Sequence, residues 1–182
     1  MNTATTPAEK SDAELIERLK AGDKAAIDPL YWRYAPGLLR IASHLTGSFD
    51  DAEDVVQDVF VGLERALRRY TEAGNFERWL RRVTIRVALS RQRLSRARGE
   101  VDLPPTLASP LPNDADSLPD RMNIETAIAA LPNHLREVFV LRELEDYSHT
   151  EIGQMLGIRR GTSEVRFFRA IRLLRAQLKK YL

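Results

Sequence analysis

The stretch 148–174 constrains the fold of this 182-residue chain more than any other. Ser148 followed three residues later by Glu151 is a capping box, which predicts the start of a helix. Gly157 suits the left-handed conformation that ends a helix. Thr162 follows almost at once and predicts the N-cap of a second helix. Two helices joined by so tight a turn predict a helix-turn-helix.

The second helix of this unit is strongly basic. Glu164 is its one acid between residues 159 and 180, and the arginines that we expect on it are Arg160, Arg166, Arg169, Arg172 and Arg175. An ordinary solvated face would explain part of this charge. A cationic helix in a helix-turn-helix, however, is suited to the major groove of DNA. The pattern therefore favours DNA binding by the C-terminal part of the chain.

A second basic block lies upstream, between residues 81 and 98, where seven arginines occur without an acid. Apolar residues recur at helical spacing from Phe76 to Leu94, so the block is predicted to be helical. Long arginines can cover apolar surface, but seven without an acid favour nucleic acid. The net charge of +2 conceals both basic blocks. Their separation predicts two contacts with a polyanion.

An acidic segment opens the helix that we predict over residues 48–67. Its acids are Asp50, Asp51, Glu53, Asp54 and Asp58. Carboxylates near a helix N-terminus complement the helix dipole, but Asp54 and Asp58 lie beyond the first turn. A metal site is not expected, because no histidine or other ligand set is close in sequence. The segment is predicted to be either a solvated face or a protein-docking face.

The remaining pattern predicts an all-α protein with two small helical domains and no strand. We expect a disordered N-terminus over 1–10, a first domain over 11–98, an acidic and proline-rich linker over 99–121, and a second domain over 122–182. Five prolines and no periodicity predict a linker stiffened towards polyproline II. At about 3.3 Å per residue it could reach roughly 75 Å. The two domains are therefore expected to be able to bind sites far apart.

Composition excludes several classes of protein. The chain has no cysteine, so disulfides and cysteine-ligated zinc are excluded. No N-terminal signal pattern or membrane-length apolar run is present, so a cytoplasmic protein is expected. The three histidines lie far apart in sequence, and no glycine-rich phosphate loop occurs. We therefore expect neither an enzyme nor a bound cofactor.

Four segments in chain order resemble the extracytoplasmic-function sigma factors of the sigma-70 family. They are AIDPLYWRYAPGLLRIASHLTGS (26–48), DAEDVVQDVF (51–60), NFERWLRRV (75–83) and ALPNHLREVFVLRELEDYSHTEIGQMLGI (130–158). The resemblance covers roughly 160 residues with family-like spacing. It implies a transcription initiation factor that binds core RNA polymerase and recognises the −10 and −35 promoter elements. It also implies contacts with the β′ clamp and the β flap of the polymerase, and an anti-sigma factor as a further partner.

The resemblance implies three sets of contact residues. The acidic helix would dock on the β′ clamp through Asp51, Glu53, Asp54, Gln57 and Asp58. The −10 DNA would be bound, with one base extruded into the loop 70–75, by Thr71, Glu72, Asn75, Arg81, Arg82, Arg86, Ser90 and Arg93. The −35 DNA would be bound by Arg160, Thr162, Ser163, Arg166 and Arg169.

The chain departs from the family pattern at several of these positions. Arg86 and Ser90 stand where an asparagine and an aspartate are common, and Ser163 replaces a commonly apolar residue. The promoter sequence that is read is therefore expected to differ. The alternative function is a stand-alone helix-turn-helix transcriptional regulator, which would explain neither the upstream basic helix nor the linker. Stoichiometric binding to core RNA polymerase distinguishes the two.

Overall fold

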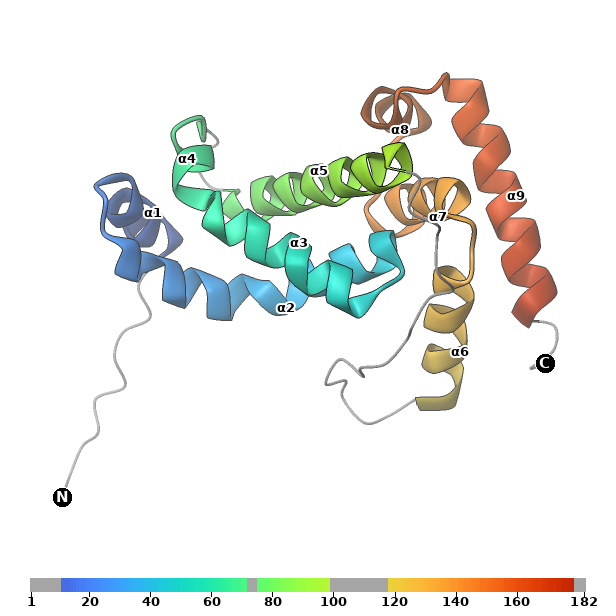
Figure 1. Cartoon of the computed structure of the whole chain (residues 1–182), viewed down its shortest axis with the longest axis horizontal. Coiled ribbons are helices and arrows are strands. Elements are labelled where there is room, and N and C mark those ends of the chain that lie inside the picture. The colour runs from blue at the N-terminus through green and yellow to red at the C-terminus, as the bar shows by residue number, and fades with distance from the viewer. Residues whose placement is uncertain (1–10, 72–74, 99–117, 179–182) are drawn as a thin grey trace.

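The computed structural model of the protein describes residues 11–71, 75–98 and 118–178, without the side chains of 118–123. Within these ranges the regular structure is helical, with no strand, as the all-α prediction requires. The expected disorder of residues 1–10 and most of the predicted linker lie outside the described residues. Figure 1 shows the order of the helices.

The start of α1 and the end of α2 both show recognisable capping chemistry. α1 (Asp12–Lys20) starts at Ser11, whose hydroxyl accepts a hydrogen bond from the Glu14 backbone N–H. A short 3₁₀ turn, η1 (Lys24–Ala26), leads into α2 (Ile27–Thr46). α2 ends at Gly47, which adopts the left-handed conformation with φ of 73°. These local signals were all present in the sequence.

Three further helices complete the N-terminal half. They are α3 (Phe49–Val61), α4 (Leu63–Leu67) and α5 (Phe76–Ala97), and both α3 and α5 pack against α2. The single helix predicted over 48–67 is wrong, because it divides at Gly62. Gly62 stays in the right-handed region, with φ of −85° and ψ of −5°, but this ψ is far from the roughly −42° of a regular α-helix. Glycine is a poor helix former, and a break there costs little.

The C-terminal half contains α6 (Leu118–Ala129), α7 (Asn133–Phe139), the π-helical turn η2 (Val140–Leu144), α8 (His149–Leu156) and α9 (Arg160–Leu178). α6 begins at residue 118, inside the stretch predicted to be linker. α7 and α8 both pack against α9. α9 forms one end of the molecule (Figure 1).

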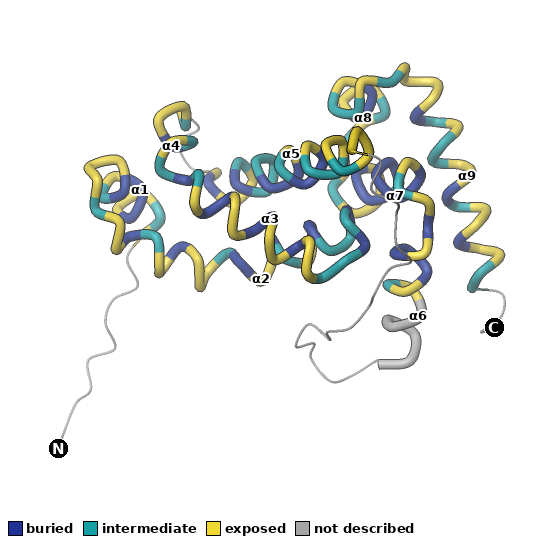
Figure 2. Tube along the Cα trace, viewed as in Figure 1, coloured by how far each residue is buried: buried dark blue, intermediate teal, exposed yellow. Residues whose placement is uncertain are grey.

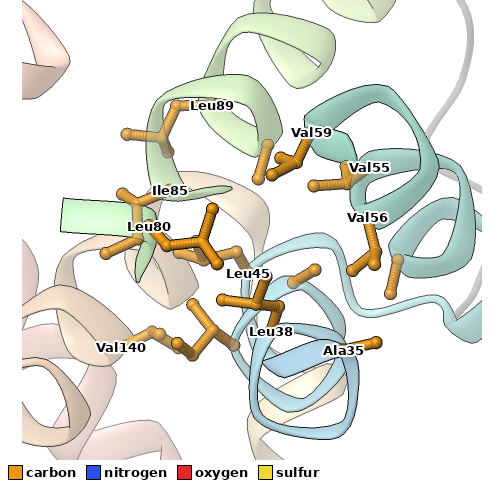
Figure 3. Close-up of a cluster of buried hydrophobic side chains, with 14 of the residues drawn as sticks. Ala35, Leu38, Leu45, Val55, Val56, Val59, Leu80, Ile85, Leu89 and Val140 are labelled. Atoms are coloured by element: carbon orange, nitrogen blue, oxygen red, sulfur yellow. The ribbon is translucent and has the colours of Figure 1, made fainter. Parts of the chain in front are cut away.

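One hydrophobic core runs through both halves of the chain. Val140 from the C-terminal half is fully buried and lies with Leu38 and Leu45 of α2 and with Leu80 of α5 (Figure 3). The buried residues follow the inner faces of the helices (Figure 2). The linker was expected to let the halves sit far apart, but here they pack together.

Arg136 of α7 ties the C-terminal half to the end of α2. Its side chain is 3% exposed. Its Nε donates to the carbonyl oxygen of Leu45 at 3.1 Å, and its Nη2 donates to that of Thr46 at 2.6 Å. The last carbonyls of a helix lack partners within the helix and carry the negative end of its dipole. A guanidinium is therefore well matched to this helix end.

Gly47 makes room for this contact. A Cβ atom placed there would lie 2.5 Å from Nη1 of Arg136. Two ion pairs reinforce the junction on either side, Arg96 with Glu137 and Arg81 with Glu145. The junction between the halves therefore combines apolar burial with directed polar contacts.

Candidate nucleic-acid and polymerase interface

The acidic residues of α3 lie on a face that the core does not use. The buried side of the helix consists of Ala52, Val55, Val56, Val59 and Phe60. The predicted docking residues are all exposed, namely Asp51, Glu53, Asp54, Gln57 and Asp58. Removing these acids should therefore leave the packing of α3 intact.

Arg91 of α5 lies between two of these acids. Its Nη1 is 3.0 Å from Oδ2 of Asp54, and its Nε is 3.0 Å from Oδ2 of Asp58. One guanidinium thus joins the acidic helix to the basic helix. Sequence reasoning counted Arg91 only as part of the basic block, and no local signal indicates this pairing.

The basic helix presents one continuous polar stripe. Arg82, Arg86, Ser90 and Arg93 recur at spacings of four, four and three, so they lie along one face of α5. Arg86, Ser90 and Arg93 are exposed, and Arg82 is half-buried. The structure thus brings these four predicted −10 residues together.

The opposite side of α5 packs against the core, and five of the six predicted apolar residues contribute to it: Phe76 and Leu80 are buried, and Trp79, Val83 and Val87 are partly buried. Its buried residues are Phe76, Leu80, Thr84, Ile85, Ala88 and Leu89. Leu94 was predicted to point inward but is 55% exposed. It lies beyond the last buried residue of the helix, where α5 runs past the core.

Arg81 lines a cleft between the two halves of the chain, together with Arg82 and Arg86 of the polar stripe. Its Nη2 lies 3.5 Å from Oε1 of Glu145. Asn75 of the N-terminal half also lines this cleft of about 650 Å³, as do Tyr147 and other residues of the loop before α8. In this arrangement the C-terminal half therefore stands over part of the predicted −10 face.

The pKa values of the two carboxylates at this junction, Glu137 and Glu145, are both raised. Burial raises the pKa of Glu137, although the neighbouring Arg96 opposes the shift. Burial likewise raises the pKa of Glu145, against the opposing charge of Arg81. Desolvation of the charged form outweighs the ion pair in both cases.

The described residues on either side of positions 72–74 pack through their aromatic rings. Phe76 is 4% exposed, and its ring centroid is 5.8 Å from that of Tyr70 and 5.7 Å from that of Trp79. Phe76 is therefore a core residue and cannot stack on a base. Thr71 is exposed, and Asn75 caps α5 by accepting a hydrogen bond from the Arg78 N–H. Glu72 lies outside the described residues.

The helix-turn-helix has the predicted start and turn. The Ser148 hydroxyl accepts from the Glu151 N–H, and Glu151 accepts in return from the Ser148 N–H at 2.8 Å, which completes the capping box. The Glu151 carboxylate also accepts a hydrogen bond from the Ser148 hydroxyl at 2.6 Å, and this bond together with that from the Ser148 N–H lowers the pKa of Glu151. Gly157 adopts φ of 67° and ends α8. At Gly153 a Cβ would lie 2.7 Å from the carbonyl oxygen of Ile158, so only glycine fits beneath the turn.

The start of the second helix differs from the prediction. α9 begins at Arg160, so Thr162 lies in its first turn, exposed, and does not cap it. Ser163 was predicted to face −35 DNA, but its side chain is fully buried and its hydroxyl lies 2.9 Å from Nδ1 of His149. Ser163 thus belongs to the contact between α8 and α9, and it is not exposed to bind −35 DNA.

The arginines of α9 differ in how they are held. Arg160 pairs with Glu164 one turn further on, at 2.8 Å from Nε to Oε1. Arg166 is half-buried, and Arg169 is exposed. Val165 and Phe168 lie among these arginines in the sequence and are 50% and 71% exposed. Sequence reasoning missed these two apolar residues, although the helical spacing contained the signal.

The described ranges contain no group of three or more histidine, cysteine, aspartate or glutamate residues that could hold a metal ion. Among the same residues, none of the helices is both long and apolar enough to cross a membrane.

Comparison with known proteins identifies both halves. The profile of sigma-70 region 2 matches residues 30–98, and that of sigma-70 region 4 matches residues 121–174. The ECF RNA polymerase sigma factor SigM of Mycobacterium tuberculosis is 30% identical over 96% of this chain and 86% of its own length. SigE of Mycolicibacterium smegmatis is 32% identical over 88% of this chain, which spans 65% of that relative.

Solved structures show the same fold. The sigma factor RpoE of Bartonella quintana, solved with the anti-sigma factor NepR, has a TM-score of 0.62 at 24% identity and covers 84% of this chain and 96% of its own. CnrH, solved with the cytosolic domain of CnrY, has a TM-score of 0.51 at 24% identity, over 94% of this chain and 99% of its own. From the matches in sequence, this chain belongs to the extracytoplasmic-function sigma factors of the sigma-70 family, the transcription initiation factors that direct RNA polymerase to promoters.

Proposed function

We propose that the acidic face of α3 docks on the β′ clamp of core RNA polymerase, while α5 and α9 bind the −10 and −35 elements. This proposal rests on one observation: the buried apolar side chains of α3 and its exposed acids lie on separate faces of the helix. Asp51, Asp54 and Asp58 contribute nothing to the core, yet they share one exposed face. Surface of that kind suits a partner of opposite charge.

The proposed DNA contacts rest on the same observation for α5 and α9, whose exposed basic side chains lie apart from their buried apolar side chains. On α5 the polar stripe of Arg82, Arg86, Ser90 and Arg93 would lie along −10 DNA. On α9, Arg160, Thr162, Arg166 and Arg169 would bind −35 DNA through phosphates and base edges. Thr71, Glu72 and Asn75 would hold a base extruded from the non-template strand.

Strand separation on this scheme needs no catalytic residue of this chain. Extruding one base costs a few kcal/mol of lost stacking, and contacts with the separated strand offset that cost. The protein would act in the cytoplasm, where promoter DNA and polymerase meet. We propose an anti-sigma factor as a further partner, since the solved RpoE structure named above is a complex with one.

A stand-alone helix-turn-helix regulator is the weaker alternative. It would account for α8 and α9 but leaves the region 2 match over residues 30–98 without a role. It also gives the exposed acidic face of α3 no macromolecule to bind.

Charge reversal tests the docking proposal directly. Asp54 and Asp58 are 59% and 51% exposed as side chains, and ion pairs at such sites contribute about 0–1 kcal/mol. Asp54→Arg with Asp58→Arg should therefore abolish binding to core polymerase while the protein stays folded. Adding Arg91→Glu restores an internal ion pair of reversed sign, and binding should still be absent.

The measurement is co-purification with core polymerase in the absence of DNA, beside a thermal melt of each variant. If the double variant still binds stoichiometrically, the docking proposal is wrong. If wild-type protein and core polymerase start transcription at the same places as core polymerase alone, the proposed function fails as a whole.

A further inference from the structure

The outward face of α9 is apolar at its centre. Ser163, Ala170 and Leu174 are the buried residues of the helix, and they define its inner side. Val165 and Phe168 lie on the opposite side and are 50% and 71% exposed. A phenylalanine side chain so exposed on a helix that binds nothing would be costly to keep in water.

The surroundings of these two side chains are cationic. Arg169 and Arg172 are exposed and adjoin them on the same side of α9. Glu164, the acid of this stretch, is held by Arg160 at 2.8 Å. An apolar centre with a positively charged rim is complementary to the major groove of DNA, where thymine methyl groups are the apolar feature between two rows of phosphates. A basic protein surface would not be attracted to it.

We propose that Val165 and Phe168 read thymine methyl groups in the −35 element, and that they take the reading role that the buried Ser163 cannot have. The inference rests on the proposed function, because it requires α9 to enter the groove. The two residues are three apart, hence about 4.5 Å along the helix axis and about 60° around it. Successive base pairs are about 3.4 Å apart. The −35 element should therefore carry thymines at neighbouring or next-neighbouring base pairs, on either strand.

Deoxyuridine substitution tests the inference one methyl group at a time. Complete polymerase with the full-length chain is first used to select promoters from random-sequence duplex DNA. Each thymine of the selected −35 element is then replaced by deoxyuridine, which removes the 5-methyl group and keeps the pairing. At one or two positions the apparent Kd should rise about fourfold, as expected for one buried methyl-sized group.

Protein variants assign each methyl group to a side chain. Val165→Ala and Phe168→Ala should weaken binding to the thymine promoter and should each abolish the effect of deoxyuridine at one position. Leu173→Ala is the matched control: Leu173 is also exposed, at 39%, but it lies about 12 Å further along α9 than Val165. It should leave both the affinity and the deoxyuridine effects unchanged.

Three outcomes would overturn the inference. One is a promoter whose binding is indifferent to deoxyuridine at every −35 thymine. Another is a deoxyuridine effect that persists unchanged in both variants. The third is a loss of polymerase binding in Val165→Ala or Phe168→Ala without DNA present, which would make the patch a protein contact. In each case normal promoter-directed transcription by the wild type would leave the proposed function standing, whereas its absence would refute that function instead.

Discussion

Gly47→Ala should loosen the junction between the two halves of the protein. Two costs are expected. The left-handed backbone at Gly47, with φ of 73°, costs an alanine about 1–2 kcal/mol. The new Cβ would also lie 2.5 Å from Nη1 of Arg136, so the guanidinium must move away from the end of α2.

The size of the second cost follows from the hydrogen bonds that are displaced. Arg136 donates to the carbonyls of Leu45 and Thr46 at 3.1 and 2.6 Å. Hydrogen bonds from charged groups contribute about 1.5–3 kcal/mol each. If both bonds are lost, we expect a cost of about 3–6 kcal/mol beyond the backbone strain.

Gly157→Ala provides the matched control. Gly157 has nearly the same backbone, with φ of 67°, but a Cβ there meets nothing within 4 Å. It should therefore cost only the strain of about 1–2 kcal/mol. In an Arg136→Gln background, Gly47→Ala should fall to the same small cost, since the group that it displaces is gone.

Two assays measure the effect. Urea unfolding gives the free energy of unfolding of each variant. Energy transfer between dyes on Val61→Cys and Ala176→Cys reports the separation of the halves, since both positions are exposed and the chain has no cysteine of its own. Equal costs for Gly47→Ala and Gly157→Ala, with unchanged energy transfer, would refute the role given to Arg136.

Two further predictions concern single side chains. Burial raises the pKa of Glu137 above its ordinary 4.5, so between that value and the raised pKa the folded protein binds more protons than the unfolded chain, and stability falls as pH rises through this window. Urea unfolding across that window should show a flatter pH dependence for Glu137→Gln than for wild type; equal slopes would contradict this. Ser148→Ala removes the capping box and should cost about 0.5–2 kcal/mol, with weaker −35 DNA binding by the complete polymerase; an unchanged thermal midpoint would show that the cap is dispensable.

Features that depend only on residues close together in the sequence were predicted well. The cap at Ser148 and the helix end at Gly157 depend on a few neighbouring residues, and both occur as expected. The all-α fold and the acidic face of α3 follow from periodicity in the same way.

Features that depend on distant residues were missed. The partners of Arg136 on α2 are backbone carbonyls that lie 91 and 90 positions away in the sequence. Every residue has a backbone carbonyl, so the sequence cannot indicate which of them Arg136 binds. Ser163 was misjudged for a different reason. Its role in −35 binding was implied by the resemblance to the family, but Ser163 lies on the same side of α9 as the buried residues Ala170 and Leu174.

The position of Arg91 has a consequence for how the two binding events affect each other. Its guanidinium is held by Asp54 and Asp58, the carboxylates that polymerase is proposed to take up. Once they are engaged elsewhere, Arg91 becomes available to a phosphate next to α5. Linkage is reciprocal, so any gain in DNA affinity caused by polymerase must equal the gain in polymerase affinity caused by DNA. A single side chain could in this way make the factor bind both macromolecules cooperatively.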